Sequence, residues 1–93
     1  MTIRLVVYME TFEGQRENAK ASSAQRAPIV REQPGCEEFE MYQSIERPDR
    51  FVLLEKWRDQ KALEDHWLTI QRPANTPPTR RIVEMERWEY SSS

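Results

Sequence analysis

The chain has 93 residues, enough for one small domain, and 32% of them are charged while only 38% are hydrophobic. With one cysteine and one histidine it can form neither an internal disulfide nor a zinc site of four Cys and His ligands. A net charge of −2 without a long Lys/Arg cluster argues against nucleic-acid binding, and no apolar run approaches the ~20 residues that span a membrane. A small core without such supports favours a homodimer.

The expected location is the cytoplasm. The apolar part of the N-terminal stretch "MTIRLVVYMET" is too short for a signal peptide and is followed closely by a glutamate. The single free thiol also fits a reducing compartment.

The first predicted elements are a strand over 2–11 and a helix over 15–33. The strand alternates, with apolar side chains on one face at Ile3, Leu5, Val7 and Met9. The helix has a thin stripe of small residues at Ala19, Ser23, Ala27 and Val30. Pro28 lies inside this pattern and should kink or restart the helix, which Pro34 and Gly35 then end.

A hairpin follows, with strands over 36–45 and 51–57 joined by a turn at 46–50. In the first strand, Phe39, Met41 and Ile45 alternate with a second set on the other face: Cys36, Glu38, Glu40 and Tyr42. Asp59 is a suitable N-cap for a helix over 60–70, whose predicted buried side carries Leu63, Trp67 and Ile70. Three prolines make 71–79 irregular, and 80–90 is a long final strand.

The predicted order is strand, helix, strand, strand, helix, strand. This order is typical of an α+β, ferredoxin-like (βαββαβ) fold, with one antiparallel sheet and both helices on one face. We expect a single domain over 1–90 and a disordered tail over 91–93. The bare face of the sheet would be covered by a second copy, which also favours a homodimer.

A four-residue turn at 47–50 would place Tyr42 opposite Glu55 and Glu40 opposite Trp57. It would gather one mixed face of acidic, aromatic and apolar residues: Glu40, Tyr42, Phe51, Leu53, Glu55 and Trp57. Such a face suits the wall of a ligand cavity. The alternative is that Trp57 is core packing and Glu55 pairs with a neighbouring cation.

Three other features have competing interpretations. His66 lies beside Trp67 and could carry a proton at neutral pH, or it could be an ordinary half-buried histidine. Trp88 and Tyr90 suit an interface better than a site. Cys36 is expected to be packing, because Glu37 and Glu38 would raise its pKa and no cation activates it.

Two stretches resemble the antibiotic biosynthesis monooxygenase family of small dimeric α+β barrel proteins. "APIVREQPGCEEFEMY" (27–42) is similar to that family's Ala-Pro-x-x-Arg-x-x-Pro-Gly-Cys pattern before an aromatic strand. "RPDRFVLLEKWRDQKALEDH" (47–66) is similar to its Pro-Asp-x-Phe-x-Leu-x-Glu-x-Trp run that ends in Ala-Leu-x-x-His.

The resemblance implies a cofactor-independent monooxygenase that oxidises a small electron-rich aromatic, such as a hydroquinone or anthrone, with O2 as co-substrate. Trp57 and His66 would be catalytic, and the substrate would be bound by Tyr42, Leu53, Glu55 and Trp67. No metal or other cofactor is expected. Haem is disfavoured because the first-strand asparagine of haem-degrading relatives is missing. In the oxygenases of the family a different asparagine is present at the position of Leu53. The alternatives are a non-catalytic ligand-binding or interaction module and a small-molecule isomerase.

Overall fold

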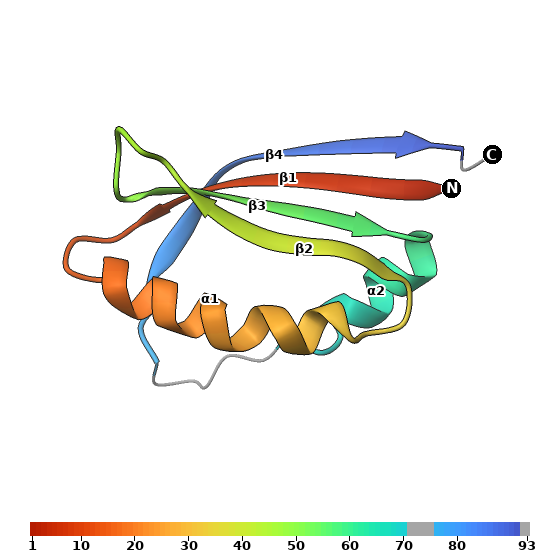
Figure 1. The fold of residues 1–93 in the computed structure, drawn as a ribbon, viewed down its shortest axis with the longest axis horizontal. Coiled ribbons are helices and arrows are strands. Elements are labelled where there is room, and N and C mark those ends of the chain that lie inside the picture. The colour runs from red at the N-terminus through yellow and green to blue at the C-terminus, as the bar shows by residue number, and fades with distance from the viewer. Residues whose placement is uncertain (71–75, 92–93) are drawn as a thin grey trace.

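The structure is a computed structural model that describes residues 1–70 and 76–91. Its elements in chain order are β1 (Thr2–Thr11), α1 (Arg16–Arg31), β2 (Cys36–Gln43), β3 (Arg50–Trp57), α2 (Gln60–Trp67) and β4 (Arg80–Tyr90). The strands form one antiparallel sheet in the order β2-β3-β1-β4, and both helices lie on the same side of it (Figure 1). The predicted ferredoxin-like α+β fold is confirmed.

Two predicted segments fall partly outside the described residues. Residues 76–79 form neither helix nor strand, as predicted, while 71–75 lie outside the description. The predicted C-terminal tail likewise lies outside it, except for Ser91. No helix within the described residues is long and apolar enough to cross a membrane.

The core lies between the helices and the inner face of the sheet. The alternating residues of β1 predicted to be buried are at most 5% exposed, at Ile3, Leu5, Val7 and Met9. They pack with Val30 of α1, Trp57 of β3 and Leu63 of α2, each 0% exposed. Burying these apolar side chains stabilises the layers by roughly 1.5–3 kcal/mol for each large residue.

Helix α1 runs through Pro28 without a break, so the predicted restart at this residue is wrong. Proline removes one hydrogen bond of the helix, because it has no N–H to donate to the carbonyl four residues earlier. Pro28 is exposed and lies in the last turn, and the fully buried Val30 fixes that turn against the sheet. Tertiary packing therefore outweighs the local cost.

The hairpin register differs from the predicted one. Tyr42 pairs with Val52 and Glu40 with Leu54, while Phe39 pairs with Glu55. The connecting turn is longer than expected, since the N–H of Ser44 still donates to the carbonyl of Arg50. A shift by an odd number of residues exchanges the two faces, so Tyr42 and Glu40 lie on the opposite face from Glu55 and Trp57.

Two further hairpin predictions are wrong for local reasons. A bulge between Cys36 and Glu38 turns Cys36 to the inner face, where it packs against the core. Ile45 lies in the turn beyond the end of β2 and is 99% exposed.

Helix α2 begins as predicted but is shorter. The carboxylate of Asp59 accepts a hydrogen bond from the N–H of Ala62 (2.9 Å), as an N-cap does. The buried residues of α2 are Ala62, Leu63 and His66. Trp67 is 44% exposed and Ile70 is 59% exposed, so the prediction that they are buried is wrong. The stripe is displaced by one residue, from Trp67 to His66.

Candidate active site

Trp57 is the centre of a buried polar-aromatic cluster on the inner face of the sheet. Its indole ring stacks on His66 of α2, with ring centroids 4.6 Å apart and the planes at 27°. Phe39 of β2 meets the same imidazole edge-on at 5.7 Å. The site therefore depends on three elements that pack together, rather than on one loop.

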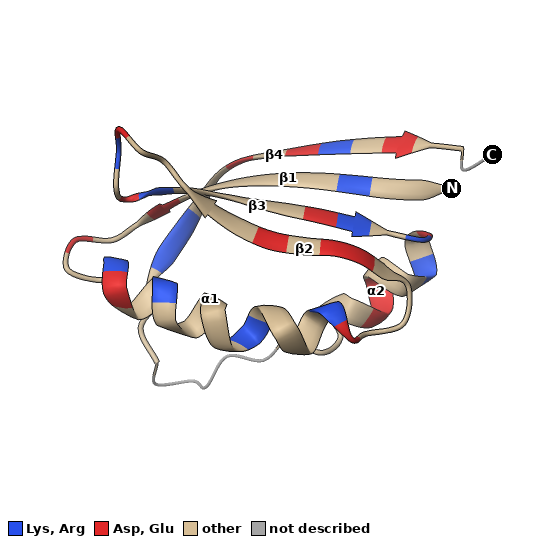
Figure 2. Cartoon of the chain, in the orientation of Figure 1, with Lys and Arg blue, Asp and Glu red and all other residues tan. Residues whose placement is uncertain are grey.

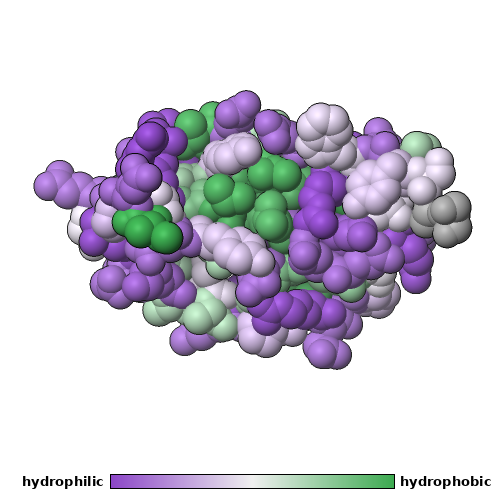
Figure 3. All heavy atoms as spheres, turned by 45° about the horizontal axis from the view of Figure 1, so that its top comes forward, coloured by the Kyte–Doolittle hydropathy of each residue, from purple (hydrophilic) through white to green (hydrophobic). Residues whose placement is uncertain are grey.

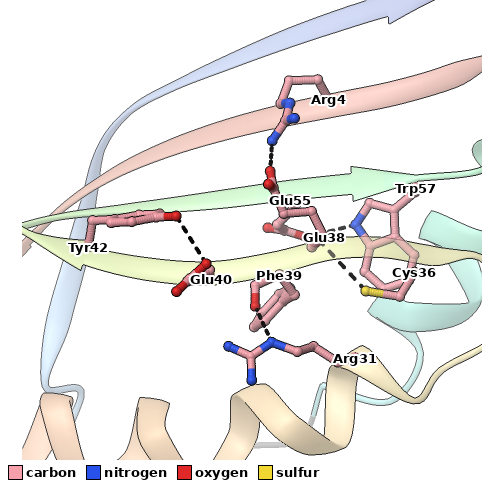
Figure 4. A network of polar contacts seen from close by, with 9 residues as sticks. All are labelled: Arg4, Arg31, Cys36, Glu38, Phe39, Glu40, Tyr42, Glu55 and Trp57. Carbon is pink, nitrogen blue, oxygen red and sulfur yellow. Dashed lines mark hydrogen bonds and ion pairs between the residues drawn. The ribbon is translucent and has the colours of Figure 1, made fainter.

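Glu55 reaches the cluster from the same strand as Trp57. Two residues apart on a strand, the side chains share a face, and the indole Nε1–H donates to Oε1 of Glu55 at 3.0 Å (Figure 4). Glu55 is 6% exposed and has no ion-pair partner among the described residues. Burial raises the pKa of Glu55 above its ordinary 4.5, and the indole N–H offsets part of this rise.

His66 is 5% exposed and is held through its ring nitrogen Nδ1. Nδ1 lies 2.7 Å from Oε1 of Gln33, whose own Nε2 donates to the hydroxyl of Thr69 at 3.1 Å. The bond to Thr69 sets the direction of the Gln33 amide, so its oxygen faces His66 and Nδ1 carries the proton. A neutral ring then has its lone pair on Nε2, which can accept a proton.

The electrostatics favour the neutral form of both acid–base groups. Burial, followed by the positive charge of Arg26, lowers the pKa of His66 below its ordinary 6.5. The pKa of Glu55 is shifted in the opposite direction, so the pKa values of the two groups become closer. Both groups contact the indole ring of Trp57, Glu55 by a hydrogen bond and His66 by stacking. Opposite pKa shifts of a neighbouring acid and base, caused by burial, are common at active sites.

A groove opens between α1 and the sheet, next to this cluster. It has a volume of about 320 Å³ and an apolar floor that includes Met41 and the buried Phe51. Small residues of α1 form the opposite wall, and three cations, Lys20, Arg31 and Arg80, line it with Glu40. Neither Trp57, Glu55 nor His66 is part of its lining. We call this pocket the α1 groove. Its lining residues are Ala19, Lys20, Ser23, Ala24, Ala27, Arg31, Glu40, Met41, Gln43, Phe51 and Arg80.

Leu53 links the groove to the cluster. It lies between Phe51 and Glu55 on the inner face of β3, pairs with Met41 across the hairpin, and packs partly buried against the core. The groove thus lies between α1 and the sheet rather than under both helices, since no residue of α2 lines it, and Leu53 occupies the position on β3 between the groove and the buried cluster.

The remaining predicted site residues lie elsewhere. Tyr42 is on the outer face of the sheet, where its hydroxyl donates to Glu40 at 3.0 Å (Figure 4). Trp67 is on the exposed side of α2. Cys36 is half-buried, and burial, followed by the charge of Glu55, raises the pKa of its thiol. The pKa is raised as predicted, but chiefly by burial rather than by Glu37 and Glu38.

Gln33, Phe39 and Arg31 were not predicted as site residues. Gln33 lies between the end of α1 and the Pro-Gly turn and meets His66 only in the folded chain, so its sequence context gives no signal. Arg31 belongs to the family-like stretch that ends α1, and its Nε donates to the carbonyl of Phe39 at 2.9 Å. Within the described residues, no three metal-ligating side chains come together.

Comparison with known proteins shows that this chain matches a known family and shares its fold with solved structures. Residues 2–69 match the family model described as antibiotic biosynthesis monooxygenase. No curated protein matches in sequence.

Solved structures with this fold cover nearly the whole chain. A conserved protein of unknown function from Bacteroides thetaiotaomicron, described as a possible oxidoreductase, has a TM-score of 0.77 at 21% identity and covers 96% of this chain and 97% of its own. A candidate antibiotic biosynthesis monooxygenase from Nitrosomonas europaea has a TM-score of 0.74 at 21% identity, covering 97% and 98%. A similar candidate from Deinococcus radiodurans has a TM-score of 0.72 at 15% identity, covering 100% and 95%. At these identities the likeness concerns the fold.

Proposed function

This chain belongs to the antibiotic biosynthesis monooxygenase family, and from that premise we propose that it oxidises a small electron-rich phenolic aromatic with O2, without a cofactor. The observation that carries the proposal is the buried cluster of Glu55, Trp57 and His66. It combines an aromatic surface with two acid–base groups whose pKa values are shifted toward each other.

The reaction is balanced without an external reductant. Proton loss from an anthrone-like CH2 group gives a delocalised anion that transfers one electron to O2. The resulting substrate radical and superoxide combine to a peroxide, which becomes a hydroperoxide on protonation. Loss of water then breaks the O–O bond and leaves a C=O group. The substrate carbon loses four electrons and O2 gains four, so one oxygen atom enters the ketone and the other leaves as water.

Each member of the cluster has a step that it can perform. Nε2 of His66 accepts the proton that generates the anion, because Gln33 holds the proton of the neutral ring on Nδ1. The carboxyl of Glu55, with its raised pKa, supplies the proton that completes the loss of water. The indole of Trp57 keeps the two groups in place through its hydrogen bond and its stacking contact.

We place the substrate in the α1 groove, with its reacting end toward Leu53. The groove volume of about 320 Å³ is at the lower end of the range for small-molecule sites and suits one or two fused rings. Leu53 is then the side chain that the reacting ring must pass to approach Glu55. In this proposal Leu53 contacts the substrate as the ring passes from the groove toward Glu55.

The test is O2 consumption by the purified protein, with quinone or ketone formation followed by absorbance, on a panel of anthrones and hydroquinones. We expect turnover in the presence of a metal chelator. Replacing His66→Gln or Glu55→Gln should lower kcat by about 100-fold, the usual contribution of one acid–base group. Gln25→Leu, on the exposed side of α1, is the control that should leave kcat unchanged. Oxidation of every substrate at no more than the uncatalysed rate, or turnover that the chelator abolishes, would disprove the proposal.

A ligand-binding module is the second candidate, favoured by the separation of the α1 groove from Trp57 and His66. In this case the groove binds an aromatic ligand and the buried cluster is structural. Two results identify a module. It binds the panel compounds in the groove without consuming O2, and His66→Gln leaves their affinities unchanged.

A further inference from the structure

The α1 groove is locally cationic in a chain whose net charge is −2. Lys20 and Arg31 come from α1 and Arg80 from the start of β4, while Glu40 is the one carboxylate in the lining. Figure 2 shows blue segments along α1 and at the beginning of β4, while red segments lie along β2 and at the two ends of α1. An apolar groove with this charge favours an anionic ligand over a neutral one.

The cations lie at the two ends of the groove. Lys20 and Arg31 are eleven residues apart on α1, which separates them by about 16 Å along the helix axis. Between them the helix presents only small residues to the groove: Ser23, Ala24 and Ala27. A flat ring can therefore lie against the helix, over Met41 and Phe51, with a polar group directed toward each end.

One end is built to hold a fixed anion. Nη1 of Arg80 donates to the hydroxyl of Ser23 at 3.0 Å, which places its guanidinium one helical turn from Lys20. The only ion pair of Lys20 among the described residues is with Glu17, at 3.7 Å. The side chain of Glu17 is 79% exposed. Such an exposed pair is weak, so Lys20 can turn to a ligand at small cost.

The other end lies beside the buried cluster. Nε of Arg31 donates to the carbonyl of Phe39, the residue that pairs with Glu55 across the hairpin. Arg31 forms no ion pair within the described part of the chain, so no carboxylate paired with it there offsets its positive charge at this end of the groove. A phenol oxygen placed there would lose its proton more easily, because the guanidinium stabilises the phenolate.

We propose that the α1 groove binds an aromatic hydroxy acid, with the carboxylate between Lys20 and Arg80 and the phenol oxygen at Arg31. This names the substrate class of the proposed oxidation and rests on that function only for the reaction, since the binding requires no turnover. The orientation directs the electron-rich ring carbon toward Leu53 and the acid–base cluster. The carboxylate end stays far from the chemistry.

The experiment measures binding of 6-hydroxy-2-naphthoate, its methyl ester and 2-naphthoate by calorimetry and ligand fluorescence. We expect the acid to bind about tenfold more tightly than the ester, the difference that one charge-assisted hydrogen bond supplies. Lys20→Gln should reduce this preference, with Arg80 still present, and leave the affinity for the ester unchanged. Lys61→Gln removes an equal charge on α2, away from the groove, and should have no effect.

Arg31 has a separate readout in the absorbance of the bound phenol. In the wild-type complex the phenol of 6-hydroxy-2-naphthoate should ionise at a lower pH than in water, and Arg31→Gln should return the ionisation toward the free value. Equal affinity for acid and ester, or equal effects of Lys20→Gln and Lys61→Gln, would overturn the proposal. Selective binding without O2 uptake would overturn the proposed oxidation and leave the hydroxy-acid site established, so the two failures are distinguishable.

Discussion

At the scale of single residues, Gln33 is the side chain that decides what His66 can do. His66 is the only histidine of the chain, so its ring nitrogens give single, assignable signals in 15N spectra. In the wild type we expect the neutral ring to carry its proton on Nδ1 and to titrate below 6.5, because burial and Arg26 disfavour the imidazolium.

Two substitutions separate the orienting role of Gln33 from simple packing. Gln33→Leu removes the acceptor and should produce a mixture of the two neutral tautomers. Gln33→Glu supplies a carboxylate and should raise the pKa of His66, because an adjacent negative charge stabilises the imidazolium. The matched control is Gln25→Glu, which adds the same charge on the same helix. Unchanged nitrogen shifts in Gln33→Leu would show that Gln33 does not set the tautomer.

The same residues show how far the sequence reaches. Glu55 and Trp57 could be placed together from sequence, because side chains two apart on a strand share a face whatever its register. Tyr42 could not, since its face depends on how many residues the turn contains. Gln33 lies 33 residues from His66 along the chain and meets it only through the tertiary fold. The family-like pattern thus contains the residues at the centre of the candidate site, and tertiary contacts bring the residues that support them.

At the scale of elements, the turn between α1 and β2 is a close contact that only glycine fits. Gly35 has φ = +81°, its carbonyl accepts the N–H of Arg58, and a Cβ at this position would lie 2.5 Å from Cβ of Ala62. This position therefore fixes the spacing between the first turn of α2 and the start of β2. The Pro-Gly pair, predicted as a helix stop, also sets the approach of the second helix.

Gly35→Ala should lower the free energy of unfolding by more than Gly14→Ala, measured by urea denaturation. Both glycines have positive φ, 81° and 78°, so both substitutions share a backbone cost of about 1 kcal/mol. Only Gly35 adds a collision, because nothing lies within 4 Å of a Cβ built at Gly14. The Ala62→Gly change should recover part of the loss in the Gly35→Ala background. Equal destabilisation by the two alanines would contradict this account.

At the scale of the whole molecule, the outer face of the sheet has no helix over it. The register places Val6, Tyr8, Val52 and Leu54 on this face, all half-buried, and Trp88 and Tyr90 of β4 beside them. The view in Figure 3 shows an apolar area framed by hydrophilic residues. Trp88 is 59% exposed, an unusual state for a tryptophan whose surface is not covered by a partner.

We therefore propose that two copies pair through these outer faces, as composition and strand pattern predict. Leu54→Asp places a charge at the middle of the face and should convert a dimer into a monomer in light scattering, with the circular dichroism spectrum retained. Ile45→Asp adds the same charge in the exposed turn and should leave the dimer intact. A wild-type chain that is monomeric at micromolar concentration would exclude the pairing. Because both helices lie on the inner side, the α1 groove should bind its ligand equally well in the Leu54→Asp monomer, which separates assembly from ligand binding.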